Sequence, residues 1–314
     1  MIELRRLQAL RELADRGTIA AAADALHLSP SAVSQQLAAL EQQIGQPLLE
    51  PDGRTVRLTP AARAVLAHAD VMFSELERMN TTLADLADGT RGEVRIGAFA
   101  TAIRGIVVPA VGLLRERAPA VELVVHDVEG PEAFNLLTQG DLDLVISMES
   151  DRAPRYDDRR YTRIALMADI LDVALPCPHP LAKQTGISLA ALAGERFVAP
   201  SRSSGCDDVI RVSCMAAGFT PAVAHRSGDW NAVMAMVGAG LGVACVPRLA
   251  QDKPPESVAI RPTTGAPACR HLFTVCRRGA EAHPVLQTIM QAFGAAAGRS
   301  DEAARSRSPT VQAA

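Results

Sequence analysis

The 314-residue chain contains few aromatic residues and few lysines, and it has no excess of positive charge. Aromatic residues make up 3% of the sequence, and Lys183 and Lys253 are its only lysines, so arginine carries nearly all the positive charge. The formal net charge is −3. A protein that bound nucleic acid by electrostatic attraction alone would be basic. The composition therefore excludes that mode of binding, but it leaves open a DNA interface of few, well-placed contacts.

Several signatures are also missing. No apolar run approaches the ~20 residues that span a membrane, and the N-terminus predicts an amphipathic helix rather than a secretory signal. The six cysteines form no CxxC pair, and GxSxG, HExxH and Walker patterns are absent. The glycines of residues 238–242 follow a helix and precede a strand, which predicts a helix cap and turn rather than a dinucleotide site. We expect a cytoplasmic bacterial protein that is not an enzyme, makes no membrane contact and holds no cofactor or metal ion.

The stretch of residues 18–50 predicts two helices joined by a tight turn. The first helix covers residues 18–26 and the second covers residues 30–44. Ser29 can cap the second helix, and Gly45 can end it. The second helix has one apolar face, and the opposite face carries short hydroxyl and amide side chains that suit phosphates and base edges. The spacing alone fits both a helix-turn-helix and an ordinary helical hairpin packed in a larger domain.

The residues of this stretch resemble the LysR-type transcriptional regulators. AAADALHLSPSAVSQQLAALEQQIGQPLLE is similar to the helix-turn-helix of that family, and PDGRTVRLTPAA is similar to its short wing. The resemblance implies binding of an interrupted palindrome in double-stranded promoter DNA by a homodimer or homotetramer, with a small-molecule effector and RNA polymerase as further partners. The implied DNA-binding residues are Thr18, Ser29, Pro30, Ser31, Ala32, Ser34, Gln35, Gln36, Arg54 and Arg57.

Three departures from the family pattern remove polar or basic contacts. Ala20 stands where the family often has Ser or Thr, Gln35 where it often has Arg, and Glu50-Pro51 where Glu-Arg is common. The first sixty residues also hold six arginines against seven carboxylates, a net charge of −1. We therefore expect two copies of the domain to share the binding of one DNA site.

Residues 60–88 predict a long helix with a narrow apolar stripe. The stripe repeats at alternating steps of four and three, which is typical of a coiled-coil seam. Such a stripe needs a partner helix, and a second copy of the chain is the simplest partner; a helix lying on its own domain is the alternative. In the family this segment is the dimerising linker helix. The predicted dimerisation residues are Val65, Ala69, Met72, Leu76, Met79, Leu83 and Leu86.

From residue 93 onward, strands and helices alternate with short turns, which predicts parallel sheets. An extended segment at residues 163–175 is expected to cross to a second lobe, and the family resemblance implies a two-lobed α/β fold similar to periplasmic binding proteins. The expected fold is thus an all-α winged helix-turn-helix and linker helix followed by this effector domain. The predicted parts are the winged helix-turn-helix at residues 1–59, the linker helix at 60–89, the effector domain at 90–297 (lobe I at 91–163 and 268–297, lobe II at 164–267) and a disordered tail at 298–314.

The effector is expected between the two lobes, where helix N-termini can present free N–H groups to a small anion. Plain N-capping by Thr101 and Ser203 explains the same residues without a ligand, and the family resemblance favours the ligand. It implies effector contacts by Thr101, Gly130, Met148, Ser201, Arg202, Ser203, Gly228 and Pro247.

Two alternative functions remain open at this stage. Some family members sense peroxide through paired cysteines, but Cys206 and Cys214 lie eight residues apart on a predicted helix, which is roughly 12 Å. This separation is too long for a disulfide without local unfolding, so a thiol-based redox regulator is the weaker alternative. The other alternative is a small-molecule binding protein that lacks regulatory DNA binding.

Overall fold

The computed structural model describes residues 2–52, 55–86, 92–202 and 204–307. The chain forms two compact units, residues 1–80 and residues 81–314, and each is described by itself. No helix within these described ranges is both long and apolar enough to span a membrane.

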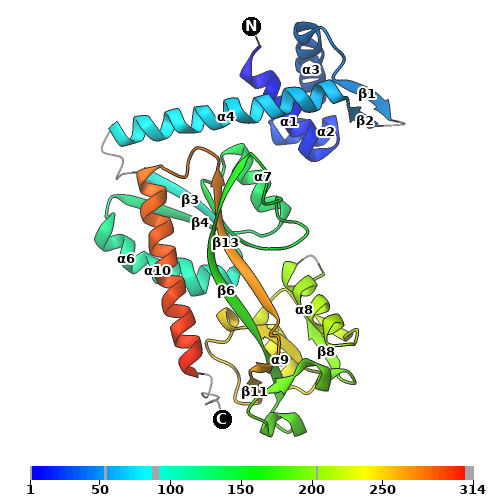
Figure 1. The fold of residues 1–314 in the computed structure, drawn as a ribbon, viewed down its shortest axis with the longest axis vertical. Helices are drawn as coiled ribbons and strands as arrows, with labels where there is room; N and C mark the ends of the chain where they lie inside the picture. Colours follow the sequence, from blue (N-terminus) through cyan, green and yellow to red (C-terminus); the bar gives the residue numbers. More distant parts are fainter. Residues whose placement is uncertain (1, 53–54, 87–91, 203, 308–314) are drawn as a thin grey trace. The chain divides into compact units, whose positions relative to one another are not determined.

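The first unit is a small helical domain with a two-stranded wing (Figure 1). Thr18 accepts a hydrogen bond from the Ala21 N–H at 3.2 Å, and Ser29 accepts one from Ala32 N–H at 3.2 Å, so both helices of the motif begin at a capping hydroxyl. The two helices predicted at residues 18–44 are confirmed. The elements are α1 (Leu4–Arg16), α2 (Ile19–Ala25), α3 (Pro30–Ile44), β1 (Leu49–Asp52), β2 (Thr55–Leu58) and the start of α4 (Pro60–Leu86).

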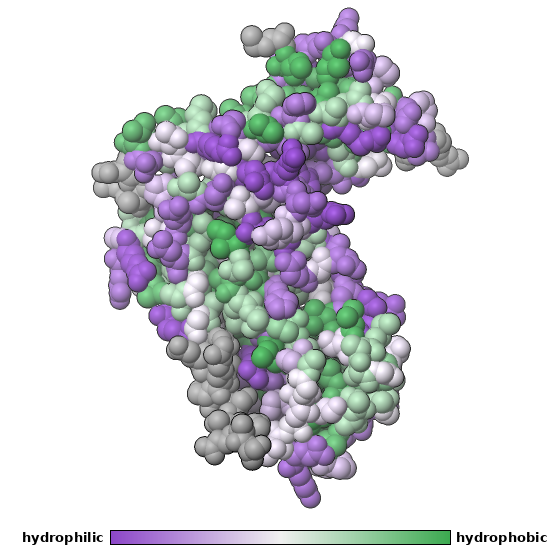
Figure 2. Space-filling view, viewed as in Figure 1, coloured by the Kyte–Doolittle hydropathy of each residue, from purple (hydrophilic) through white to green (hydrophobic). Residues whose placement is uncertain are grey.

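Helix α4 confirms the long helix predicted after the wing, but its apolar stripe has two environments. Ala69 is buried in the core of the first unit, and Val65 packs against that core. The prediction that Ala69 faces a second subunit is therefore wrong, because this residue completes the core of its own domain, whereas Val65 is half-buried and its predicted role stays a prediction. Leu76 is half-buried. Four other members of the stripe are exposed: Met72, Met79, Leu83 and Leu86. Figure 2 shows that hydrophobic and hydrophilic residues are mixed over the surface of the protein.

The second unit is built on a seven-stranded sheet in which parallel and antiparallel strands meet. β3 pairs in parallel with both β4 and β5, as the alternating pattern predicted, whereas β13 runs antiparallel to β5 and β6. The order is β10-β6-β13-β5-β3-β4, with β11 also on β6. The strands are β3 (Gly92–Ala98), β4 (Val121–Asp127), β5 (Leu144–Met148), β6 (Tyr161–Pro176), β10 (Ala244–Pro247), β11 (Val258–Arg261) and β13 (Cys269–Arg277).

Lobe I places helices on both faces of this sheet. Alternate residues of β5 point to opposite faces: Leu144 and Ile146 belong to one core cluster, and Val145 belongs to another. Helices α6 and α10 lie side by side over the first face, and α7 covers the second (Figure 1). The helical elements are α5 (Ala100–Ala102), a π-helical turn (Ile103–Val107), α6 (Val108–Arg117), α7 (Pro131–Gln139) and α10 (Pro284–Arg307).

The long strands β6 and β13 connect lobe I to lobe II. β6 confirms the extended segment predicted at residues 163–175. Lobe II comprises β7 (Ile187–Ser188), β8 (Arg196–Ala199), α8 (Gly205–Ala216), β9 (Ala222–Arg226), α9 (Trp230–Gly238) and β12 (Thr263–Thr264), together with β10, β11 and the short 3-10 turns Pro180–Lys183, Leu189–Leu192 and Arg248–Ala250.

The C-terminal segment departs from the sequence prediction. A disordered tail was expected from residue 298, but α10 continues to Arg307. The prediction is wrong for residues 298–307. Residues 298–307 have no apolar period, but they contain two alanines, three arginines and one glutamate, all of which are strong helix formers. Residues 308–314 lie outside the described residues.

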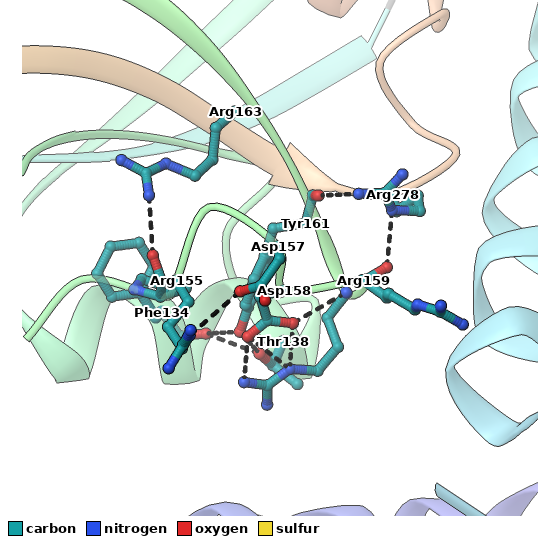
Figure 3. A network of polar contacts seen from close by, with 11 residues as sticks. Phe134, Thr138, Arg155, Asp157, Asp158, Arg159, Tyr161, Arg163 and Arg278 are labelled. Atoms are coloured by element: carbon teal, nitrogen blue, oxygen red, sulfur yellow. Dashed lines mark hydrogen bonds and ion pairs between the residues drawn. The ribbon is translucent and has the colours of Figure 1, made fainter. Parts of the chain in front are cut away.

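An arginine-rich loop joins β5 to β6 and is held by polar contacts (Figure 3). The Arg160 guanidinium binds the Asp158 carboxylate at 2.7 Å, and Arg278 donates to the backbone carbonyls of Arg159 and Tyr161 at 2.8 and 2.9 Å. Burial would raise the pKa of Asp158, but the hydrogen bonds and charge of Arg160 and the charge of Arg278 outweigh it. The pKa of Asp158 is therefore lowered.

Asp158→Asn should remove the pH-dependent part of the free energy of unfolding that the Asp158 carboxylate contributes. Because the folded pKa is lowered, the ionised carboxylate stabilises the fold above its unfolded pKa of about 3.9, and this stabilisation is lost as the pH falls through the folded pKa. Urea unfolding from pH 7 to acid should show a wild-type advantage at neutral pH that shrinks at low pH. Asp157→Asn is the control, because its ion pair with Arg155 is exposed; equal behaviour of the two variants would contradict the prediction.

Gly242→Ala should destabilise lobe II. A Cβ at this position would lie 2.3 Å from the backbone oxygen of Arg196, a contact that requires the backbone to shift. We expect a loss of about 1–3 kcal/mol in the free energy of unfolding. Gly294→Ala is the matched control, because a Cβ there meets nothing within 4 Å and Ala favours helix. A Gly242→Ala variant as stable as Gly294→Ala would refute the close approach.

Candidate functional site

The first candidate site is the exposed start of α3. Ser29, Pro30, Ser31, Ser34 and Gln35 are exposed there. The Ser34 hydroxyl donates to the Pro30 carbonyl at 2.9 Å, and the hydroxyls of Ser29 and Ser31 lie 2.9 Å apart. These bonds fix the hydroxyls on the helix surface while leaving acceptor positions open to a DNA donor.

The remaining predicted DNA contacts flank this helix end. Thr18 is exposed at the start of α2, while Ala32 and Gln36 are half-buried on α3. Arg57 on β2 has 67% of its side chain exposed and forms an ion pair with Glu50 on β1 at 2.9 Å. Arg54 lies outside the described residues.

A carboxylate that the sequence analysis did not single out ties the wing to α3. Glu41 accepts hydrogen bonds from the backbone N–H groups of Leu48 at 2.7 Å and Leu49 at 3.0 Å. Thr59 donates to the Pro47 carbonyl at 2.9 Å and accepts from the N–H of Ala62 at 3.1 Å, which caps α4. The wing is therefore positioned from both ends relative to α3.

The second candidate site is a cleft of about 780 Å³ lined by residues of both lobes. Four predicted contacts line it: Thr101, Gly130, Ser201 and Gly228. The volume falls within the range of about 300–1,000 Å³ typical of small-molecule sites.

Three predicted effector contacts are corrected by the structure. Met148 on β5 is buried in the hydrophobic core, and Pro247 is buried at the end of β10; neither is among the lining residues. Arg202 instead lines a separate pocket of about 500 Å³ with Arg211 and Arg226. Ser203 lies outside the described residues; the cap of α8 is the neighbouring Ser204, which accepts from the Cys206 N–H at 3.3 Å.

A buried arginine that the sequence analysis missed forms part of the cleft wall. Arg270 on β13 has 1% of its side chain exposed, and its guanidinium binds Asp169 on β6 at 2.7 Å. It also donates to the Thr101 hydroxyl at 2.8 Å and lies 4.9 Å from the centroid of the Phe99 ring. The Asp169 carboxylate accepts the Leu249 N–H at 3.3 Å. This arrangement joins β6, β13 and the first turn after β3.

The same contacts give Thr101 a different role from capping. The N-cap of α5 is Phe99, whose side chain forms no cap bond, and Thr101 lies inside the helix with its oxygen bound to Arg270. Arg270 could have been noticed in the sequence because it lies two residues before buried Leu272 in an apolar strand pattern. Strand period two places both residues on one face.

The cleft carries more negative than positive charge. Asp127, Glu129 and Glu132 line it, against Arg152 and the already paired Arg270. Burial raises the pKa of Glu129; Arg270 opposes this and Asp127 adds to it. Arg152 donates to the Arg202 carbonyl at 2.9 Å. Arg202 was the positive charge expected to attract an anionic effector. Because Arg202 lies outside the cleft, that charge does not support the expectation of an anion.

The two cysteines considered for redox sensing do not favour that function. Cys206 and Cys214 are both buried on α8, and burial raises the pKa of Cys206 to about 12 and that of Cys214 to about 11. Burial also raises the pKa of Cys245. Reactive thiols need a lowered pKa and access to solvent, so these thiols have the properties of core side chains.

Two protein-family descriptions match this chain, and each covers one of the two candidate sites. The description "Bacterial regulatory helix-turn-helix protein, lysR family" matches residues 4–63, and "LysR substrate binding domain" matches residues 87–298. The chain belongs to the LysR family of transcriptional regulators. This LysR-type regulator accordingly combines a DNA-binding helix-turn-helix domain with a two-lobed effector-binding domain, as the sequence predicted.

Individual relatives cover most of the regulator. The uncharacterized HTH-type transcriptional regulator YnfL of Escherichia coli K12 is 32% identical over 250 residues, which cover 78% of this chain and 82% of YnfL. The transcriptional dual regulator GltC of Bacillus subtilis is 29% identical over 247 residues, which cover 78% of this chain and 81% of GltC.

Solved structures share the fold. A mutant of Corynebacterium glutamicum OxyR has a TM-score of 0.64 at 23% identity and covers 99% of this chain and 97% of its own. Full-length CbnR, solved with its target DNA, has a TM-score of 0.57 at 22% identity and covers 94% of this chain and 99% of its own.

Arg270→Met should destabilise the effector domain strongly, because it leaves Asp169 buried without its cation. We expect a loss of about 3–5 kcal/mol, measured by urea unfolding through the fluorescence of Trp230, the chain's only tryptophan. The double variant Arg270→Met/Asp169→Leu should recover much of the loss. Arg211→Met is the control, since its 3.6 Å pair with Asp208 is exposed and such pairs contribute about 0–1 kcal/mol. Equal losses in the Arg270 and Arg211 variants would contradict a structural role of the buried pair.

Proposed function

We propose that this regulator reads an interrupted palindrome in promoter DNA with two copies of α3, one from each of two subunits. The two subunits form a homodimer, or they are one pair within a homotetramer. The exposed polar start of α3 beside the wing carries this proposal. Ser31, Ala32, Ser34, Gln35 and Gln36 face the major groove, because a recognition helix contacts base edges through its first turns. Thr18 and Ser29 lie at the starts of α2 and α3, where backbone N–H groups bind phosphates, and Pro30 contacts the DNA beside them as the first residue of α3.

The arginines of the wing contact the DNA backbone in this proposal. Arg57 exchanges its exposed partner Glu50 for a phosphate, an exchange that costs little because exposed ion pairs are weak. Arg54 takes a similar role. With so few cations, the affinity of one domain is modest, and linkage of two domains supplies the rest.

The exposed part of α4 supplies the contact between subunits. Met72, Met79, Leu83 and Leu86 are the members of the apolar stripe that remain available, and Leu76 lies between them. Two such stripes in contact bury apolar surface that would otherwise face water.

The effector acts in the cleft between the lobes, with contacts from Thr101, Gly130, Ser201 and Gly228. A ligand that touches both lobes binds the closed arrangement more tightly than the open one, so it shifts the population of the two. The shift changes the placement of the DNA-binding pairs and, through it, transcription by RNA polymerase. The regulator acts in the cytoplasm, where bacterial promoter DNA lies.

Gln35→Ala should weaken specific binding to the DNA upstream of the regulator's own gene. Loss of one bidentate amide contact corresponds to about 1–3 kcal/mol of base discrimination, measured by retention assays across a salt series. Gln42→Ala is the control, because Gln42 is exposed near the other end of α3. If neither this DNA nor a genome-wide selection yields specific binding, the alternative of a small-molecule binding protein without DNA binding replaces the proposal.

A further inference from the structure

The cleft gathers carboxylates on one short segment of lobe I. Asp127 ends β4, and Glu129 and Glu132 lie on either side of the first residue of α7. All three line the cleft. Glu132 sits in the first turn of α7, where the helix dipole stabilises an anion. Asp127 and Glu129 precede the helix.

The arginines in the cleft do not neutralise this segment. Arg270 is paired with Asp169 and bound to Thr101, so the pair as a whole adds no net charge. Arg152 supplies one positive charge and directs a guanidinium nitrogen to the Arg202 carbonyl. Across the described residues, no side chain forms a hydrogen bond or an ion pair with the carboxylate of Glu129.

The side chain of Glu129 lines the cleft and is exposed to the solvent that fills it. Burial raises its pKa despite the nearby charge of Arg270, with Asp127 and Arg152 as the other charged groups that act on it. A cation that enters the cleft therefore meets a carboxylate that no described side chain pairs, and the attraction between the two charges favours its binding.

An aromatic ring lines the same cavity from lobe II. Trp230 begins α9 and is half-buried. Tryptophan is the best aromatic partner for a cation. The other aromatic residue of the lining, Phe99, already faces the Arg270 guanidinium.

We infer that the effector carries a positively charged nitrogen group, a protonated amine or a guanidinium, which binds the Glu129 and Asp127 carboxylates of lobe I and the Trp230 ring of lobe II. This inference rests on the proposed function of the cleft and names its ligand class. Contact with both lobes makes the cation a bridge across the cleft. Its binding is therefore coupled to closure.

Three five-carbon probes that differ only in their end groups test this inference on the full-length protein: pentane-1,5-diamine, pentane-1,5-diol and pentanedioate. Because Trp230 is the only tryptophan, its fluorescence reports binding in the cleft directly. The diamine should bind at least roughly tenfold more tightly than the diol or the dianion at constant ionic strength. Glu129→Gln should weaken diamine binding roughly tenfold to 100-fold, as expected for loss of a charged hydrogen bond, and should improve binding of pentanedioate.

Glu122→Gln is the matched control, because Glu122 is an exposed carboxylate on β4 outside the cleft lining. Diamine binding should be unchanged in this variant. Tighter binding of pentanedioate than of the diamine, or a diamine response that Glu129→Gln leaves intact, would overturn the inference. A wild-type protein that responds to no diamine at millimolar concentration would overturn it as well.

Two further measurements on the same protein preparations test the proposed function independently of the ligand class. A pentanedioate response that Ser201→Ala abolishes would retain the cleft as the effector site while rejecting a cationic ligand. Promoter retention and its loss in Gln35→Ala report on DNA binding whatever the probes do.

Discussion

The effector domain depends on the buried ion pair of Arg270 and Asp169. Both side chains are almost fully removed from solvent, and each isolated charge would be costly there. The buried pair is tolerated because further hydrogen bonds satisfy both of its charged groups. Arg270 also donates to the Thr101 hydroxyl, and Asp169 also accepts a hydrogen bond from the backbone N–H of Leu249. One interaction thus fixes the register of β6 and β13, the two strands that run through both lobes, and it positions the first turn that borders the cleft.

This pair also connects ligand chemistry to the connecting strands. Arg270 lines the cleft, while Asp169 lies behind it on β6. A second ion pair on the same strand joins Asp172 to Arg248 at 2.9 Å. Lobe II is therefore attached to β6 through charged contacts of fixed geometry as well as apolar packing. A ligand that alters the field at Arg270 acts on a group shared by both lobes, which is the physical requirement for coupling occupancy to lobe arrangement.

Much of the fold followed from local pattern, and much of the cleft did not. Caps at Thr18 and Ser29 and the alternating strands set the elements, because these signals are local. The cleft depends on contacts between residues 100 to 170 positions apart, such as Arg270 with Thr101 and Asp169. The spacing of residues along the sequence cannot predict contacts between positions so far apart. The same limit explains the stripe of α4, where Ala69 fits a heptad but is buried in its own domain.

The low charge of the DNA-binding domain makes geometry the main source of its specificity. A strongly basic domain would bind any DNA, and a change in subunit placement would alter its affinity little. Here the available contacts are hydroxyls, amides and a wing arginine that is already paired with Glu50. Such contacts are productive only when both recognition helices meet their half-sites together. In the proposed mechanism, a change in the spacing of the two DNA-binding domains therefore becomes a change in DNA affinity, and closure of the effector lobes supplies that change in spacing.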